Sequence, residues 1–197
     1  MSNRPRGGRF HAGRMESQFL QKFKMLNFAG VAFFMSTALI ATDPRNFRDV
    51  LGCCPTSVAV ITALNGEDRF GMVVGTFTSI SLDPPLVGFF PAKGSSTWSR
   101  IAETGRFCAN ILSAEQAHIS RLFSSKAEDK FAEVIHGSSP SGLPLIDGIA
   151  AWVDCRIQSV QEIGDHFLVV GAVEAIGQGT TSPLVFLKGG YCVPQSL

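Results

Sequence analysis

The sequence predicts a mostly β protein, a closed or partly closed β-barrel of the Greek-key type with a few short flanking helices. Runs rich in β-branched and aromatic residues recur along the chain, each bounded by glycine, proline or asparagine. The helical stretches between them are few and short, and they lack the strand–helix–strand rhythm of a Rossmann sheet. Hydrophobic residues make up 45% of the 197 residues and charged residues 17%, which is enough for one sizeable core.

The body of the chain is expected to begin with a short helix. Asp43 suits its N-cap and Pro44 its first position, and Phe47, Val50 and Leu51 give it one apolar face. Seven strands are expected after it, each a short run that ends at a turn or breaker residue: 56–64, 69–81, 86–90, 107–112, 149–160, 167–176 and 184–187.

Two further helices are expected between these strands. Ser95-Ser96-Thr97 precedes a helix of about two turns that stops at Gly105. Ser113 and Gln116 form a capping box, which opens a helix through Phe123. The polar stretch 137–144, rich in glycine and proline, predicts a surface loop.

Residues 1–42 form an N-terminal extension that differs from the domain expected over 43–197. Its first 24 residues carry six basic residues and one acidic residue, and no charge occurs from Met25 to Thr42. This pattern is typical of a signal peptide, a short membrane anchor or an organelle transit segment. We favour a different explanation, a wrongly assigned start with Met35 as the true N-terminus, because the body has a cytosolic character. A peptide beginning at Ser2 in natively expressed protein would contradict it.

Charge and cysteine usage exclude several kinds of partner. After residue 24 the chain has 11 basic and 15 acidic residues, so nucleic-acid binding is not expected. The five cysteines include no CxxC pair and no cluster at metal-ligand spacing. They predict reduced, mostly buried thiols, no metal site and a cytoplasmic protein. A redox-active Cys53-Cys54 pair is the alternative to two small side chains that start a strand.

The most specific signal lies in residues 71–86, GMVVGTFTSISLDPPL. Hydroxyl side chains gather here on extended backbone beside two glycines, followed by a double proline. Hydroxyls and exposed backbone N–H groups in such a bend can hold a phosphate or a polar heteroaromatic edge. An ordinary Ser/Thr-rich strand is the other interpretation of this segment alone.

Together with other segments, this stretch resembles the flavin reductase-like family, FMN-binding split barrels that reduce free flavin for two-component monooxygenases. The resemblance runs in order along about 150 residues. The matching segments are Cys54–Val58 (PTGV element), Ser79–Leu86 (SxSLDPPL), Lys93–Trp98 (KxSxTW), Phe107–Leu112 (FxxNxL), 142–146, Trp152 with Cys155, Gly164-Asp165-His166, and Tyr191. The resemblance implies a homodimer with flavin near the subunit interface.

The resemblance also implies roles for individual residues. His166 would lie beside the nicotinamide as the catalytic residue. The cofactor-binding residues would be Pro55, Thr56, Ser57 and Val58 along the flavin ring, then Val73, Val74, Gly75, Thr76, Phe77, Thr78, Ser79 and Ser81 at the ring edge, ribityl chain and phosphate. Lys93, Ser95, Ser96 and Thr97 are candidates for the phosphate, since a lysine charge and hydroxyls at a helix N-terminus both suit a dianion.

The match fails at three positions of the flavin site. Where the family has G-x-T-x-N-S-F, this chain has Val73 in place of threonine and Gly75 in place of asparagine, while Thr76 keeps a hydroxyl. Ser57 replaces the glycine of PTGV. Two lost polar contacts, at about 0.5–1.5 kcal/mol each, predict looser flavin binding. Looser binding suits a reductase that uses flavin as a substrate, and equally a relative that no longer reduces flavin.

The resemblance therefore implies an NAD(P)H:flavin oxidoreductase. NADH or NADPH would pass hydride to N5 of FMN or FAD, and the reduced flavin would leave for a partner monooxygenase. The alternative is a non-reducing split-barrel protein that binds flavin or another small molecule. A membrane-anchored or exported redox protein is a third hypothesis, and it rests only on the apolar N-terminal stretch.

Overall fold

The computed structural model describes residues 39 and 42–195, and the chain divides into two units, residues 1–39 and 40–197. Only the second unit is considered below. The prediction for residues 1–42, including a start at Met35, lies almost wholly outside the described residues. Within them, no helix has the length and apolar character to cross a bilayer.

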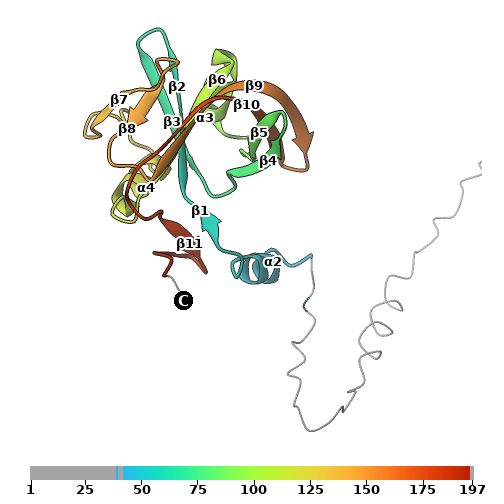
Figure 1. Cartoon of the computed structure of the whole chain (residues 1–197). Helices are drawn as coiled ribbons and strands as arrows, with labels where there is room; N and C mark the ends of the chain where they lie inside the picture. The colour runs from blue at the N-terminus through green and yellow to red at the C-terminus, as the bar shows by residue number, and fades with distance from the viewer. Residues whose placement is uncertain (1–38, 40–41, 196–197) are drawn as a thin grey trace, which may run out of the picture. The chain divides into compact units, whose positions relative to one another are not determined.

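One curved antiparallel sheet of seven strands dominates the unit (Figure 1). Its order is β3 (Asp68–Val74), β2 (Ala59–Asn65), β6 (Arg106–Ile111), β9 (Ala151–Ile163), β10 (His166–Gln178), β5 (Pro85–Phe89) and β4 (Thr78–Leu82). The two edge strands, β3 and β4, are consecutive in the sequence, and only residues 75–77 join them. Because four residue steps span at most about 14 Å, the end of β3 and the start of β4 lie near each other, and the sheet curves into a partly split barrel.

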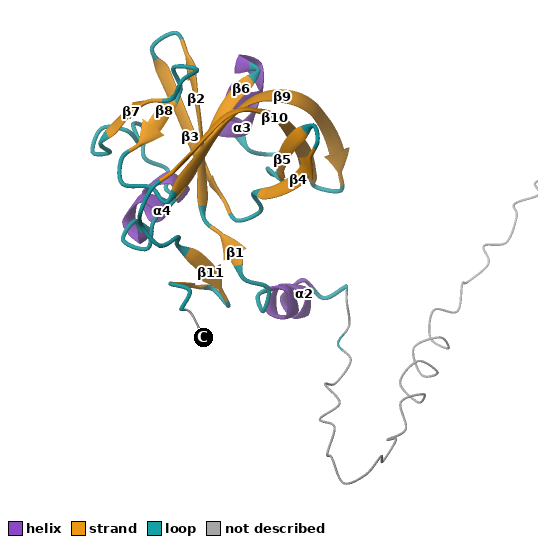
Figure 2. Ribbon diagram, in the orientation of Figure 1, coloured by secondary structure: helices purple, strands orange, loops and turns teal. Residues whose placement is uncertain are grey.

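Two smaller sheets and three short helices complete the described part of the chain (Figure 2). One sheet has the order β1 (Thr56–Ser57), β11 (Val185–Leu187), β12 (Gly190–Cys192), and the other pairs β7 (His136–Ser138) with β8 (Pro144–Ile146). The helices are α2 (Pro44–Leu51), α3 (Ser96–Thr104) and α4 (Ala117–Ser124). Asp43 caps α2, Ser95 caps α3, and α3 ends at Gly105 in the left-handed region, as expected.

The structure corrects several element boundaries. The run 56–64 breaks at Val58, so that β1 joins the small sheet and only β2 joins the barrel. The run 69–81 divides at 75–77, and the expected loop 137–144 contains parts of the β7–β8 hairpin. Helix α4 begins at Ala117, because residues 113–116 form a turn in which the Ser113 N–H donates to Gln116 Oε1 at 3.0 Å.

The barrel interior is an aromatic cluster. The ring of Phe89 makes edge-on contacts with Trp98 (centroids 5.6 Å apart) and Phe107 (5.2 Å). Since Trp98 and Ile101 are buried in this cluster, α3 packs its apolar face against the barrel. A second buried cluster includes α4 and β8, and its largest fully buried ring is that of Phe123.

A buried asparagine joins three strands between the two clusters. Asn110 in β6 is fully buried, and its Nδ2 donates to Val60 O (3.2 Å) and Thr62 Oγ1 (3.0 Å) on β2. Its Oδ1 accepts from Ile146 N on β8 at 2.8 Å. The asparagine of the FxxNxL segment therefore satisfies buried backbone groups, which explains why a polar residue occupies a core strand.

The expectation of mostly buried cysteines is wrong. Only Cys108 and Cys155 are buried. Burial, followed by the neighbouring charge of Asp154, raises the pKa of the Cys155 thiol to about 12. The other three cysteines (Cys53, Cys54 and Cys192) are exposed, and the first two lie in the turn after α2 instead of starting a strand.

Candidate active site

Four segments that carry the predicted site lie side by side at one end of the barrel. The hydroxyl of Ser57 donates to the Phe77 carbonyl at 3.2 Å, which joins β1 to the 75–77 bend. The Phe90 N–H donates to Thr76 Oγ1 at 3.0 Å, which joins the bend to the end of β5. Beyond Phe90, Ala92 forms a β-bridge with His166. We call this continuous band, residues 55–58, 75–81, 90–97 and 164–167, the site strip.

The middle of the site strip offers polar groups that the protein does not use. Strand β4 is an edge of the barrel sheet, so one side of its backbone has no neighbouring strand. Its pairing with β5 shifts between Ser79 and Ser81, which leaves Ile80 as an extra residue in a bulge. The hydroxyls of Thr56, Ser79 and Ser81 make no hydrogen bond to any residue that the structure describes.

The candidate phosphate residues cluster at the start of α3. Ser95 Oγ accepts from the Trp98 N–H at 3.2 Å, so this hydroxyl is committed to the helix cap. Ser96 and Thr97 follow in the first helical turn, where N–H groups and the helix dipole favour an anion. Lys93 is ion-paired, with its Nζ 2.6 Å from Glu162 Oε2. A phosphate that binds Lys93 must therefore compete with Glu162.

His166 opens β10 at the rim of the barrel, as the sequence predicts, and its side chain is 44% exposed. Its Nδ1 lies 2.7 Å from Asp165 Oδ1. This hydrogen bond is the main cause that lowers the pKa of the Asp165 carboxyl. Because the contact engages Nδ1, Nε2 is the ring atom left for a ligand.

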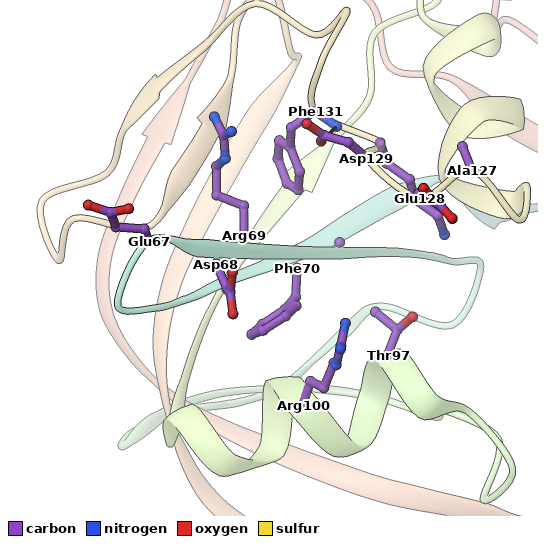
Figure 3. Close-up of a pocket in the computed structure, with 12 residues that line it drawn as sticks. Glu67, Asp68, Arg69, Phe70, Thr97, Arg100, Ala127, Glu128, Asp129 and Phe131 are labelled. Carbon is purple, nitrogen blue, oxygen red and sulfur yellow. Dashed lines mark hydrogen bonds between the residues drawn. The ribbon is translucent and has the colours of Figure 1, made fainter.

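Three hollows on the described surface lie largely away from the site strip. One of about 390 Å³ lies beside the outer edge of β3, where Phe70 points toward α3 and Arg69 to the other side (Figure 3). Thr97 and Arg100 of α3 line it from below. Two others, of about 590 and 810 Å³, contain no predicted site residue. Thr97 is thus the only predicted site residue to line any of these three hollows. More than half of the residues of the strip from 75 to 97 are exposed, so this part of it is an open surface.

Comparison with known proteins identifies the family. The family model for the flavin reductase like domain matches residues 51–195. This chain belongs to the flavin reductase-like family. A flavin reductase from Pseudomonas putida is 46% identical over 153 residues, which cover 77% of this chain and 90% of that protein. HsaB from Mycobacterium tuberculosis, the reductase subunit of a flavin-dependent monooxygenase, is 43% identical over 152 residues, 76% of this chain and 81% of that protein.

A solved structure agrees with these relatives. The NADH:FAD oxidoreductase SgcE6 of Streptomyces globisporus C-1027, in complex with NAD and FAD fragments, matches with a TM-score of 0.75 and 30% identity. The match covers 80% of this chain and 96% of that chain. The predicted family, the split-barrel fold and the activity of a flavin reductase that serves a monooxygenase are confirmed. These similarities also favour the reductase over the non-reducing alternative.

The site strip of this flavin reductase fits a flavin by the chemistry of its groups. A flavin has an apolar ring with polar edges, and FMN and FAD add a phosphorylated ribityl chain. The strip offers half-buried Phe77, hydroxyls without a partner among the described residues, an open strand edge and a lysine. Val73, also predicted for the site, lies just before the strip in β3 and packs against the second buried cluster. Sequence reasoning missed Phe90 as part of the strip and Glu162 as the partner of Lys93, since nothing in their own segments indicates the contacts that the fold supplies.

Proposed function

We propose that this flavin reductase binds FMN or FAD along the site strip as an exchangeable substrate, with NADH or NADPH as the donor. The observation that carries the proposal is the joining of four separate sequence motifs into one continuous strip through Ser57, Thr76 and the Ala92–His166 bridge. The reduced flavin then serves a partner monooxygenase.

The chain itself binds and orients in this proposal. The flavin, when bound, supplies the group that accepts hydride. Thr56 and the 75–81 segment hold the ring edge and ribityl chain, and Lys93 with Ser96 and Thr97 holds the phosphate. His166 contacts the nicotinamide through the face of its imidazole ring or through Nε2. Both remain available because the hydrogen bond to Asp165 engages only Nδ1. No side-chain acid or base is required, because alignment of two reactants accounts for the rate.

We propose that the working assembly is a cytoplasmic homodimer. Large apolar side chains remain exposed on the single chain: Phe47, Val50 and Leu51 on α2, and Ile80, Leu82 and Phe90 beside the site strip. Helix α2 has no buried residue, although its apolar side chains lie on one face. An amphipathic helix normally packs that face against another part of the protein or against a partner. A second copy that covers these residues would also enclose the open strip. Sedimentation velocity on purified protein tests this, and a monomer at micromolar concentration contradicts it.

An anaerobic titration separates binding from reduction. FMN, FAD and riboflavin are added while flavin fluorescence is followed, and NADH or NADPH is then supplied while absorbance at the flavin band is recorded. We expect binding followed by bleaching with at least one pair of flavin and nicotinamide. Binding without bleaching by either nicotinamide refutes hydride transfer, and no binding of any flavin refutes the site.

A further inference from the structure

The hollow of about 590 Å³ lies over the last residues of β10, at the other end of that strand from His166. The paired strands β9 and β10 form its floor, where Trp152 stands opposite Gly177 in the register. None of the described residues that line it belongs to the site strip. Its volume falls within the range of about 300–1,000 Å³ that is typical of small-molecule sites.

A glycine makes room for the aromatic ring in this floor. A Cβ built on Gly177 would overlap Nε1 and Cε2 of Trp152, and the φ of Gly177 is not in the left-handed region. The glycine is therefore needed for the space that the indole takes, and not for an unusual backbone conformation. Trp152 is half-buried, and its indole N–H has no acceptor among the described residues. This donor is available to a ligand.

One wall of the hollow, residues 179–184, is fixed at both ends by backbone hydrogen bonds. The N–H of Gly179 donates to Ala150 O at 2.8 Å. At the other end, the N–H of Leu184 donates to Leu112 O at 2.9 Å. A wall held in this way keeps the hollow formed before a ligand arrives, as in most small-molecule sites.

The lining combines apolar side chains with a few polar groups. Gln178 and Thr181 are its polar residues, and neither side chain bonds to a residue that the structure describes. No charged residue is among the described residues of the lining, and Ile176 is its one exposed large apolar side chain, at 70%. A protein partner would need a wider surface, about 800 Å² on each side, so the hollow fits a small molecule better.

We propose that this hollow binds a small, planar, uncharged aromatic compound that has a hydroxyl or carbonyl oxygen. The ring of the compound contacts the indole of Trp152, and its oxygen bonds to the indole N–H, Gln178 or Thr181. This site is separate from the site strip, and the inference does not depend on the proposed binding of flavin there.

Titration of the full-length chain with 2-naphthol tests the site through the indole N–H signals in ¹⁵N NMR spectra. The protein has two tryptophans, Trp152 in the hollow and Trp98, which is 3% exposed in the barrel core. The variant Trp152→Phe assigns the two signals. We expect the Trp152 signal to shift saturably, with a dissociation constant of about 0.01–1 mM, and the Trp98 signal to stay in place.

Two comparisons define the chemistry of the site. Decahydro-2-naphthol has the same skeleton without the aromatic rings, and it should bind about 2- to 12-fold more weakly because it loses the ring contact. Excess FMN should leave the titration with 2-naphthol unchanged, because the hollow shares no residue with the site strip.

Two exposed isoleucines provide a matched pair of variants. Ile176→Ser removes an apolar side chain from the hollow and should weaken binding of 2-naphthol about 3- to 10-fold. Ile135, 79% exposed, lies outside the hollow, and Ile135→Ser should not change the affinity.

Four results would overturn the inference. They are no saturable shift of Trp152, equal binding by the two serine variants, displacement of 2-naphthol by FMN, and a Trp152 signal that moves on dilution of the protein alone together with its sedimentation coefficient. The last result would mean that a second copy fills the hollow. Failure of the protein to bind or reduce flavin would instead overturn the proposed function and leave this site intact.

Discussion

Glu162 restrains Lys93, and its removal should tighten the binding of phosphorylated flavins. Lys93 Nζ and Glu162 Oε2 are 2.6 Å apart, and their side chains are 35% and 72% exposed. An exposed pair of this kind contributes about 0.2–1 kcal/mol, because water and counterions screen it. A flavin phosphate that takes Lys93 must give up that energy. The variant Glu162→Gln frees Lys93 and removes a negative charge beside the phosphate.

The expected result is a dissociation constant for FMN that falls up to about fivefold, the factor that corresponds to 1 kcal/mol. Riboflavin has no phosphate, so its affinity should not change. The gain should shrink when ionic strength rises from about 0.01 M to 0.15 M, as the Debye length shortens from about 30 to 8 Å.

The control is the same change in a Lys93→Gln background, where Glu162→Gln should have no effect on FMN. Fluorescence titration of the four proteins with FMN and riboflavin provides the test. An equal gain for riboflavin, or a gain that persists without Lys93, would show that Lys93 does not bind the phosphate.

Three further predictions concern the scaffold. Asn110→Ala leaves the buried Ile146 N–H without an acceptor and should lower Tm by about 2–12 °C, while the exposed Ser159→Ala should not; equal Tm values would refute the role of the asparagine. Tyr191→Phe removes a 2.9 Å hydrogen bond to Ser120 Oγ and should cost about 0.5–1.5 kcal/mol in urea unfolding, with wild-type stability as the contrary result. Alkylation of the native protein near pH 8 should modify only the exposed cysteines, because burial raises the pKa of the other two thiols. Mass spectrometry of peptides should find the label on Cys53, Cys54 and Cys192. Cys108 and Cys155 should carry none until the protein is unfolded, and their labelling in the native protein would contradict the prediction.

The sequence predicts the ends of helices correctly where neighbouring residues determine them. Asp43, Ser95 and Gly105 mark helix ends correctly, because caps depend on a few adjacent residues. The break at Val58 has no such signal. The run from Thr56 to Leu64 is uniformly suited to strands, and only the distant partners β11 and β3 decide that it serves two sheets.

In the candidate site, too, the sequence predicts the local features but not the contacts between distant residues. Its hydroxyls and glycines are visible in residues 71–86, and the family resemblance orders them along the chain. What each hydroxyl does depends on contacts that span many residues. Ser57 bonds to a carbonyl 20 residues away, and Lys93 pairs with Glu162 69 positions later, so neither role is encoded near the residue itself.

The bend 75–77 connects the two open edges of the barrel sheet, and the site strip crosses it. A molecule bound along this bend would contact the ends of both edge strands, β3 and β4, and so link the two edges of the sheet. If flavin binds there, as proposed, its binding favours the folded barrel, in which the two edges are close, over the unfolded chain. At a hundred times its dissociation constant a ligand adds about 2.7 kcal/mol to the free energy of unfolding. Under the proposed function, release of reduced flavin to a partner removes this added stability in each cycle.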